Sequence, residues 1–476
     1  MSRRQAPFTH MRKAATRPLY TCRDCGHTPA KWEGKCSRCG AWNSVEERAP
    51  STTVAAERRP VAHLLAPETE AVELSQVPAD GAPRLRTSIA EFDRVLGGGL
   101  VPGATALIAG DPGIGKSTLL LQVAAAVARS GTKVLYATGE ESAPQLRARA
   151  LRLGTPGDGV HILATGDAGE IAAHIGHLRP GLAVVDSIQT AHAPTEDGAP
   201  GTVVQVRESA AYLSQAARAQ GAALVLTGHV TKDGAIAGPR LLEHMVDAVL
   251  HLEGEPGGGL RLLRGVKNRF GPTDEIGVFE MRGNGLTEVE DPSRTFLAQR
   301  QAGLPGSAVA TLIEGTRPIT VEVQALVTSS ALPSPRRVAN GVDMSRLLLI
   351  SAVLSKRLKL PVATSDIVVN VAGGLRVREP AADLAVALAI VSSIVDRPVD
   401  AGIAAAGEVG LSGEVRAVSQ PSRRSTEARR LGFRTCLLPE SGSDSEAKQD
   451  NRAGNGVTRV SNIGDAVRAA IPEPGR

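Results

Sequence analysis

The clearest pattern along the chain is an alternation of short apolar runs with longer amphipathic stretches between about residues 85 and 293. Five apolar runs predict β-strands at residues 104–109, 133–138, 160–164, 182–186 and 222–227. Between them, apolar residues recur at helical spacing in segments such as 116–129 and 203–220. Strands of continuous Val, Leu and Ile that alternate with helices are typical of a parallel sheet covered on both faces. This part of the chain is therefore predicted to be an α/β domain.

Beyond about residue 293 the alternation gives way to a mixed pattern. Strands are predicted at 308–314, 319–327, 366–371, 403–408 and 436–439, and helices at 344–358 and 381–394. The first two strands are close enough in the chain to pair with each other, and the second helix is rich in Ala and Leu. This order predicts an α+β domain.

The domain boundaries are expected where these patterns change, because 476 residues are too many for one compact core. Residues 46–84 are rich in Pro, Ala, Glu and Thr and lack apolar periodicity, which is typical of a linker. The predicted division is an N-terminal arm with a small metal-binding segment (1–45), a linker (46–84), the parallel-sheet domain (85–293) and the α+β domain (294–476).

Four of the five cysteines lie in two Cys-x-x-Cys pairs, Cys22 with Cys25 and Cys36 with Cys39. Each pair can direct two thiolates at one point, and a glycine follows each pair where left-handed backbone is favoured. The two pairs together predict a tetrahedral zinc site in a small ribbon, with redox-active or coincidental cysteines as the alternative. Cys436 is expected to be a buried strand residue.

The basic charge is concentrated in the same segment. Residues 1–48 hold ten Lys/Arg and four Asp/Glu, a net charge of +6, so the rest of the chain sums to −1. With only two Trp, three Tyr and six Phe, a nucleic-acid surface that stacks bases on aromatic rings is not expected, and any such binding should depend on phosphates. No apolar run is long enough to cross a bilayer. The first twenty residues lack the apolar core of a secretory signal, which favours the cytoplasm, with an organellar transit peptide as the alternative.

A phosphate-binding loop lies between the predicted strand at 104–109 and the predicted helix at 116–129. It matches G-x-x-x-x-G-K-[ST] at every fixed position, and its residues are Gly110, Asp111, Pro112, Gly113, Ile114, Gly115, Lys116 and Ser117, followed by Thr118. The glycines let backbone N–H groups face the phosphates, and the helix N-terminus adds its dipole. Lys116 is expected to bind the β- and γ-phosphates of ATP, and Ser117 to ligate Mg²⁺.

Two acidic positions complete the predicted site. Asp186 ends an apolar strand and fits the second Mg²⁺ ligand of such ATPases. Glu140 and Glu141 follow the strand at 133–138, at the edge of the sheet where ligands bind in such folds. Adjacent side chains point in different directions, so only one of them can orient the attacking water. Glu140 is the predicted catalytic residue, Glu141 is the reserve, and a solvated pair of acids is the structural alternative.

Two further polar stretches have both a structural and a functional interpretation. In residues 228–234, His229 or Thr231 could contact the γ-phosphate, and a purely structural role is equally open. Lys267 and Arg269 lie in a basic turn, residues 267–271, after a predicted strand. This turn could be a surface hairpin, or a cationic finger that reaches phosphates bound to a neighbouring subunit.

These motifs together resemble a known family. The run FDRVLGGGL at residues 92–100, followed by the phosphate loop, is similar to that of RecA-like ATPases, which include the KaiC clock proteins. The four-cysteine ribbon, the 267–271 signature and the mixed C-terminal domain narrow the resemblance to the bacterial RadA (Sms) family, from about residue 19 to the C-terminus. The resemblance implies a zinc ribbon, a RecA-like ATPase core and a C-terminal domain like that of Lon proteases.

The resemblance also implies a function. Members of this family are ATP-dependent motors of DNA repair and homologous recombination, usually hexameric rings, which drive branch migration on single-stranded and branched DNA alongside the RecA recombinase. By this likeness, Lys267 and Arg269 are expected to act on ATP bound between subunits.

A protease and a signalling ATPase are the competing functions. Alignment with the Lon nucleophile loop places Ala381 at the serine position and puts the partner lysine near Ser422. A methyl group cannot be a nucleophile, so proteolysis is not expected. A KaiC-like signalling ATPase remains the alternative, although it would leave the ribbon and the 267–271 turn unexplained.

Overall fold

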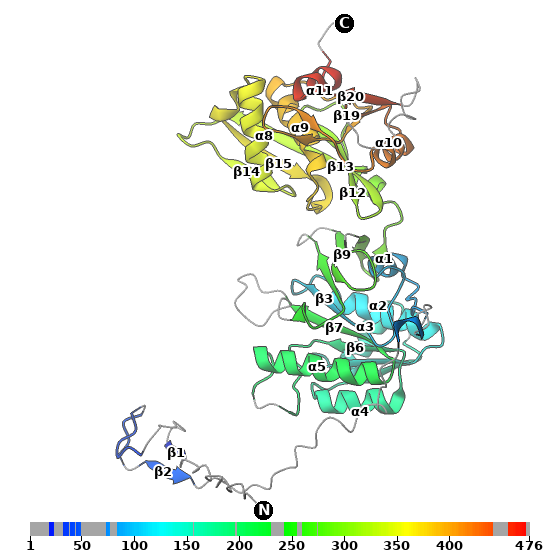
Figure 1. The fold of residues 1–476 in the computed structure, drawn as a ribbon, viewed down its shortest axis with the longest axis vertical. Helices are drawn as coiled ribbons and strands as arrows, with labels where there is room; N and C mark the ends of the chain where they lie inside the picture. Colours follow the sequence, from blue (N-terminus) through cyan, green and yellow to red (C-terminus); the bar gives the residue numbers. More distant parts are fainter. Residues whose placement is uncertain are drawn as a thin grey trace, which may run out of the picture. The chain divides into compact units, whose positions relative to one another are not determined.

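The computed structural model describes residues 19–22, 32–37, 39–42, 44–48, 73–76, 83–155, 157–195, 198–229, 242–254, 259–273, 275–440 and 456–472. The chain divides into two compact units, Met1–Val72 and Glu73–Arg476 (Figure 1). In the first unit, β1 (Leu19–Cys22) pairs antiparallel with β2 (Val45–Arg48), so that Cys22 lies opposite Val45.

A twisted sheet of nine described strands, in the order β11-β10-β9-β8-β3-β7-β6-β4-β5, forms the first half of the second unit. Its parallel strands are β3 (Thr105–Gly110), β4 (Val134–Thr138), β5 (Val160–Leu163), β6 (Leu182–Asp186), β7 (Ala223–His229) and β8 (Ala248–Glu253). The predicted α/β fold with a RecA-like core is confirmed, and each of the five predicted strands lies within two residues of its expected bounds.

The sheet is not parallel throughout, which the sequence pattern did not indicate. Beyond β8 it continues through three antiparallel strands, β9 (Leu260–Asn268), β10 (Ile276–Arg282) and β11 (Gly285–Glu288). The connections between these strands are short, and a parallel crossover needs a dozen or more residues, so the strands fold back as hairpins.

Helices cover both faces of the parallel strands, as predicted. On one face lie α2 (Lys116–Arg129) and α3 (Ala143–Arg152), and on the other α4 (Ala168–Leu178) and α5 (Val203–Ala219), which lie side by side (Figure 1). Successive side chains along a strand point to opposite faces of the sheet. In β4, Tyr136 packs with the first pair of helices and Leu135 with the second. The predicted bounds of α2 and α5 hold to within one residue.

The C-terminal half is built on a seven-stranded mixed sheet in the order β14-β15-β13-β12-β16-β19-β20. Its strands are β12 (Ser307–Glu314), β13 (Arg317–Ser329), β14 (Arg337–Asn340), β15 (Ser365–Val371), β16 (Ile403–Ala405), β19 (Thr435–Pro439) and β20 (Val457–Val460). The helices with eight or more described residues are α8 (Met344–Arg357), α9 (Asp383–Val395), α10 (Pro421–Arg430) and α11 (Ile463–Ala470). The first ten residues of α9 are all buried, which explains its Ala- and Leu-rich composition.

The two halves share one apolar cluster. Leu262 of β9 and Ile276 and Val278 of β10 pack in the same cluster as Val321 of β13 and Ile390 of α9. The C-terminal half therefore covers this outer part of the nine-stranded sheet, where a helix would otherwise be needed. The predicted boundary between residues 293 and 294 falls inside the short helix α7 (Pro292–Leu297).

The position aligned with the Lon nucleophile lies in apolar packing. Ala381 is 2% exposed and belongs to a cluster with Ala428 and Cys436. Beside it, the fully buried Arg424 forms an ion pair with Glu379. Cys436 is buried in β19 as expected, and burial raises the pKa of its thiol to about 12. The contacts of Ala381 agree with a domain that does not use this position for nucleophilic chemistry.

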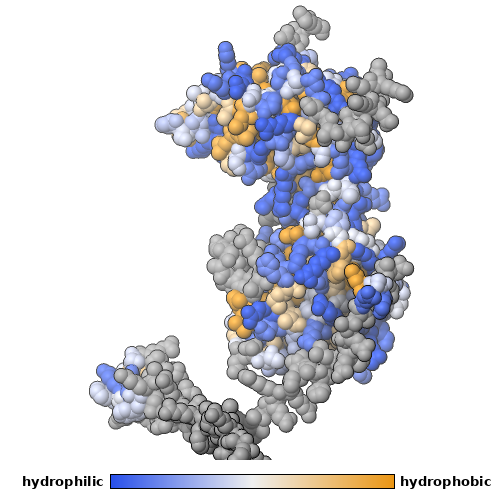
Figure 2. All heavy atoms as spheres, in the orientation of Figure 1, coloured by the Kyte–Doolittle hydropathy of each residue, from blue (hydrophilic) through white to orange (hydrophobic). Residues whose placement is uncertain are grey.

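Polar residues cover most of the face shown in Figure 2, and apolar side chains are exposed there in smaller areas. Leu326 of β13 and Leu348 of α8 are among the exposed apolar residues of the C-terminal half. Within the part of the chain that the structure describes, no helix combines the length and apolar character needed to span a membrane.

Candidate nucleotide-binding site

The phosphate loop connects β3 to α2 and requires glycine at two points where other parts of the chain come close. A Cβ atom on Gly110 would lie 2.5 Å from the carbonyl oxygen of Leu252, and one on Gly115 would lie 2.7 Å from Cε of Met281. Gly115 also has a φ of +116°, in the left-handed region where other residues are strained. The loop therefore has the expected strand–loop–helix context, with its backbone at the N-terminus of α2.

Lys116 is the first residue of α2, and its side chain folds back over the loop. Its ammonium donates to the carbonyl oxygens of Gly110 at 2.8 Å and Asp111 at 3.0 Å. Burial lowers the pKa of Lys116, and the negative charges of Asp186, Glu140 and Asp111 oppose that effect. The ammonium thus lies among the groups that the sequence assigned to phosphate and Mg²⁺ binding. Ser117 and Thr118 follow it in the first turn of α2, half-buried.

Asp186 ends β6 and is held by two hydroxyl groups. The Tyr136 hydroxyl donates to its Oδ2 at 2.8 Å, and Thr227 Oγ1 donates to its Oδ1 at 2.7 Å. Burial and then the charge of Asp186 raise the pKa of Tyr136 well above its ordinary value, so Tyr136 remains a neutral donor. Both carboxylate oxygens are therefore fixed in orientation by neighbouring strands. This is how ligating carboxylates are commonly supported.

Glu140 and Glu141 point to different partners. Glu140 is exposed, and its Oε1 accepts a hydrogen bond of 2.5 Å from Ser187 Oγ, next to Asp186. Glu141 instead forms an ion pair with Arg149 of α3. Since Glu140 also contributes to the charge felt by Lys116, it lies on the phosphate-loop side of this edge. The geometry favours Glu140 over Glu141 as the residue that orients water.

We expect Glu140→Gln to retain ATP binding but to reduce ATP turnover by roughly 10²–10⁴-fold, because an amide cannot accept the proton of an attacking water. Glu141→Gln is the matched control, since it changes the adjacent acid in the same way and should leave turnover within a few-fold. Steady-state hydrolysis and nucleotide binding measured on both variants test this. Normal turnover in Glu140→Gln together with loss in Glu141→Gln would reverse the assignment.

The stretch at 228–234 is only partly described. His229 is the last residue of β7, and its backbone lies opposite Gly110 in the parallel register, which places it beside the start of the phosphate loop. Thr231 lies outside the described residues. Either interpretation of this stretch, a γ-phosphate contact or a structural turn, stays a prediction.

The basic turn at 267–271 joins β9 to β10, and its two cations contact the preceding chain segment. Lys267 Nζ donates to the carbonyl oxygens of Glu243 at 2.6 Å and Val246 at 2.8 Å. The guanidinium of Arg269 pairs with the carboxylate of Asp247 at 3.2 Å and keeps 55% of its side chain exposed. Arg269 is therefore accessible to another molecule.

This turn lies at the opposite ends of the strands from the phosphate loop of the same chain. The Arg269 N–H donates to the Asp247 carbonyl, and the Asp247 N–H donates to the carbonyl of Thr105, the first residue of β3. The phosphate loop begins at the last residue of β3, Gly110, about 16 Å further along the strand. Arg269 is thus far from the nucleotide site of its own chain, whereas its exposed side could face a neighbouring one.

In the N-terminal unit, the second cysteine pair forms a tight turn. The Gly40 N–H donates to the Cys36 carbonyl at 2.9 Å, and Gly40 has the left-handed φ of +75° that the sequence predicted. Cys36 is buried and Cys39 is exposed. Cys25 and the side chain of Cys22 lie outside the described residues, so the described side chains alone supply no group of three ligands. The turn at Cys36–Gly40 fits one half of a four-cysteine zinc site.

We expect Cys36→Ser to release zinc and to unfold the N-terminal segment without loss of ATP binding. A segment this small has little apolar core, and residues 1–72 form a unit of their own. Elemental analysis of both proteins, with nucleotide binding, makes the comparison. Cys436→Ser is the control, since it changes a cysteine of β19 and should keep one zinc per chain. Native protein without stoichiometric zinc would contradict the expectation.

Several residues that shape the site carried no local sequence signal. Ser187, Tyr136 and Thr227 position the two predicted acids, yet each is an ordinary residue of a strand or strand end. Arg261 of β9 donates from Nε to the carbonyl oxygen of Ile114 in the phosphate loop at 3.1 Å, from 147 residues further along the chain. Only the pairing of β9 with β8, and of β8 with β3, brings it there.

Comparisons with known proteins find similar domains in three parts of the chain and relatives that match most of it. Family models match an AAA domain at residues 68–235, subunit ChlI of Mg-chelatase at 339–442 and a rubredoxin metal binding domain at 20–47. The DNA repair protein RadA of Bacillus subtilis (strain 168) is 45% identical, over 96% of this chain and 99% of the relative. The protein of that name from Brucella abortus (strain 2308) is 48% identical, over 90% and 92%. Among solved structures, the RadB recombinase is 27% identical and covers 43% of this chain and 100% of its own, with a TM-score of 0.35.

Proposed function

The chain belongs to the RadA family of DNA repair proteins, with an ATP-hydrolysing core, and we propose that it is a DNA-stimulated ATPase motor that promotes branch migration of recombination intermediates. The observation that carries the proposal is the cluster of Lys116, Asp186 and Glu140 around the phosphate loop, in a chain whose relatives match it over nearly its whole length. The motor activity goes beyond the names of those relatives, and the site supports the ATP hydrolysis that such a motor requires.

Within this proposal, the backbone at Gly110–Ser117 and the side chain of Lys116 bind the ATP phosphates, with Thr118 beside them. Ser117 and Asp186 are the residues that would hold Mg²⁺, which supplies charge neutralisation at the phosphates when it is bound. The hydroxyls of Tyr136 and Thr227 keep Asp186 oriented for this role. Glu140 accepts a proton from the attacking water and aligns it, and Ser187 limits the rotation of Glu140.

The basic turn is proposed to complete the site of a neighbouring subunit. Its distance from its own phosphate loop and the exposure of Arg269 support action across a subunit boundary. A head-to-tail arrangement of subunits that repeats this contact forms a ring when the rotation between subunits closes, and a closed hexamer is the proposed state. Asp247 would hold Arg269 until the neighbouring phosphates compete for it.

Single-stranded and branched DNA are the proposed nucleic-acid partners, and the RecA recombinase is the proposed protein partner. Exposed basic side chains such as Arg294 and Arg434 can contact phosphates, and aromatic residues are scarce.

Because this binding would depend on phosphates, we expect log affinity for single-stranded DNA to fall steeply as log salt concentration rises. Fluorescence anisotropy over a salt series measures the slope, and a nearly flat dependence would point to stacking or burial instead.

The proposed function is tested first by ATP hydrolysis with and without single-stranded DNA. We expect DNA to increase the rate several-fold, whereas a rate indifferent to DNA would favour a signalling ATPase. The second test is ATP-driven branch migration on a synthetic recombination intermediate, with Lys116→Ala as the control for ATP dependence. Absence of branch migration in a preparation that hydrolyses ATP in response to DNA would reject this motor activity and leave the ATPase assignment in place.

A further inference from the structure

Strand β9 connects three regions that are distant in sequence. Arg261 near its start contacts the phosphate loop, Arg264 in its middle contacts the C-terminal half, and Lys267 near its end opens the basic turn. Arg261 and Arg264 are three residues apart and therefore lie on opposite faces of the strand, about 10 Å from each other. One strand of nine residues thus contacts the phosphate loop and the C-terminal half, and leads into the basic turn.

The contact between β9 and the phosphate loop is made by the buried guanidinium of Arg261. Arg261 is 8% exposed, its Nε donates to the Ile114 carbonyl at 3.1 Å, and its Nη1 donates to the Leu260 carbonyl at 2.8 Å. Ile114 lies between Gly113 and Gly115, both of which have left-handed φ angles. A charged donor held in a fixed place can therefore select one conformation of a loop whose glycines would allow several.

The contact on the other face is a buried ion pair. Arg264 Nη1 and Glu314 Oε2 are 2.7 Å apart, and their side chains are 6% and 8% exposed. Glu314 is the last residue of β12, at the tip of the hairpin formed by β12 and β13. Because removing one partner would leave an uncompensated charge in the interior, this pair strongly resists separation.

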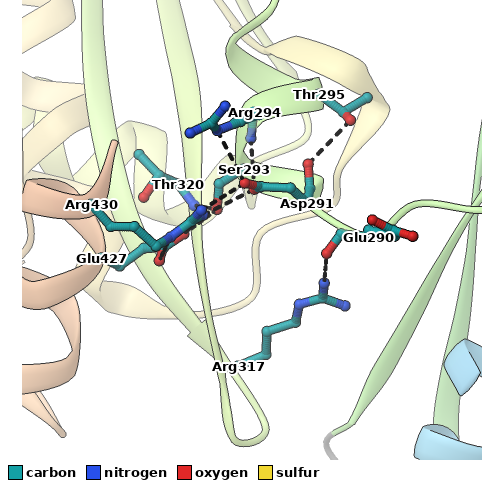
Figure 3. A network of polar contacts seen from close by, with 9 residues as sticks. All are labelled: Glu290, Asp291, Ser293, Arg294, Thr295, Arg317, Thr320, Glu427 and Arg430. Carbon is teal, nitrogen blue, oxygen red and sulfur yellow. Dashed lines mark hydrogen bonds and ion pairs between the residues drawn. The ribbon is translucent and has the colours of Figure 1, made fainter. Parts of the chain in front are cut away.

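Two further contacts hold the same hairpin tip against the nine-stranded sheet. The Thr316 N–H donates to Glu275 Oε1 at 2.9 Å, one residue before β10. Arg317 Nη1 lies 2.9 Å from both carboxylate oxygens of Glu91 in α1 (Ala90–Val95). The Nη2 of Arg317 donates to the Glu290 carbonyl at 2.8 Å (Figure 3). The tip is therefore fixed to β9, to the start of β10 and to α1.

The segment that joins the two halves is held by a second set of contacts. Asp291 forms an ion pair with Arg430 of α10 at 2.6 Å, and Arg430 also pairs with Glu427 at 2.8 Å (Figure 3). Ser293 Oγ donates to Glu427 at 2.7 Å. The connecting segment at Asp291 and Ser293 is thus tied to the C-terminal half.

From these contacts we propose that β9 is a positioning element, through which the C-terminal domain sets the conformation of the phosphate loop and of the basic turn, with Arg261, Arg264 and Glu314 as positioning residues. The proposal rests on the proposed function for the identity of the nucleotide, ATP. In a DNA-stimulated motor, such an element would allow DNA held by the C-terminal domain to change ATP affinity at a site it does not touch.

The first test concerns the contact with the loop. Arg261→Met keeps an apolar chain of similar length but removes the donor to Ile114, and we expect the KM for ATP to rise on the order of tenfold with a smaller change in kcat. Arg261→Lys retains a charged donor and should recover part of the affinity. An unchanged KM in a folded Arg261→Met protein would overturn this part of the proposal.

The second test asks whether a change in the C-terminal domain alters the phosphate loop and the basic turn. In Glu314→Gln, hydrogen exchange of the amides at residues 110–117 and 267–271 should quicken by about tenfold, and the KM for ATP should rise. Glu322→Gln is the matched control, because Glu322 is a buried carboxylate of the same hairpin that bonds Ser307 at 2.5 Å instead of β9. Faster exchange confined to the hairpin tip would show a merely local role and overturn the proposal.

If Glu314→Gln fails to fold, the double variant Arg264→Met/Glu314→Leu carries the test, since it removes both charges and keeps apolar contact. We expect the same faster exchange at 110–117, and wild-type exchange there would overturn the proposal. These measurements need no DNA. A wild-type ATPase that ignores DNA would reject the proposed motor, whereas unchanged loop exchange and KM in these variants would reject the positioning role of β9.

Discussion

Lys116→Ala should abolish ATP turnover, with a loss of at least about 10²–10³-fold in kcat. The ammonium of Lys116 is buried among Asp186, Glu140 and the first carbonyls of the phosphate loop, where it can neutralise charge that develops on transferred phosphate. Alanine removes this charge from beside the two acids. Steady-state hydrolysis at saturating ATP is the measurement, with circular dichroism to show that the fold is kept.

Lys133→Ala provides a control for this change. Lys133 is an exposed lysine just before β4, at the amino ends of the parallel strands, whereas the phosphate loop follows the carboxyl end of β3. Its replacement should leave turnover within a few-fold of the native rate. Turnover in Lys116→Ala that stays within tenfold of the native protein would remove Lys116 from its assigned role and would require another cation at the phosphates.

Arg269→Ala should slow ATP hydrolysis by about 10²–10⁴-fold while sparing assembly and most of the ATP affinity. Cationic fingers contribute roughly 10³–10⁵ in rate in other NTPases, and the expected loss allows for Lys267 in the same turn. If Arg269 were only a surface residue of the hairpin, the change would cost under about 0.5 kcal/mol in stability and leave hydrolysis untouched. Hydrolysis rate, ATP affinity and oligomer size, measured on one preparation, separate the two cases.

The direction of action is decided by mixing two inactive variants. Subunits with Glu140→Gln keep the basic turn but lack the acid, and subunits with Arg269→Ala keep the acid but lack the finger. Mixed rings should recover partial activity wherever an intact turn faces an intact Glu140. Because the turn lies about 16 Å from its own phosphate loop along β3, we expect this recovery. Its absence in rings shown to be mixed would mean that Arg269 acts within its own subunit or on DNA.

The elements of the fold follow from local sequence to a large extent. Continuous apolar strands alternating with amphipathic helices are local patterns, and α2 was placed to the residue because the phosphate loop marks its start and Gly131 lies just beyond its end. Strands β8, β10 and β11 are not predicted from the sequence pattern, since polar residues or glycine interrupt their apolar runs. The shared apolar cluster of β9, β10 and the C-terminal half could not be anticipated either, because it depends on packing between segments far apart in the chain.

The sequence by itself determined the phosphate loop, the two cysteine pairs, the candidate acids and the family, because each is a spacing of residue types within a short segment. Only the tertiary structure decided that Glu140 rather than Glu141 turns toward Asp186, since the choice depends on Ser187 and Arg149, which reach the two acids from different elements. The tertiary structure also decided that Arg269 lies at the opposite ends of the strands from the phosphate loop, and that Arg261 contacts this loop at Ile114. Their places are set by the order and register of strands, and pairing between strands is a long-range property that no short stretch of sequence contains.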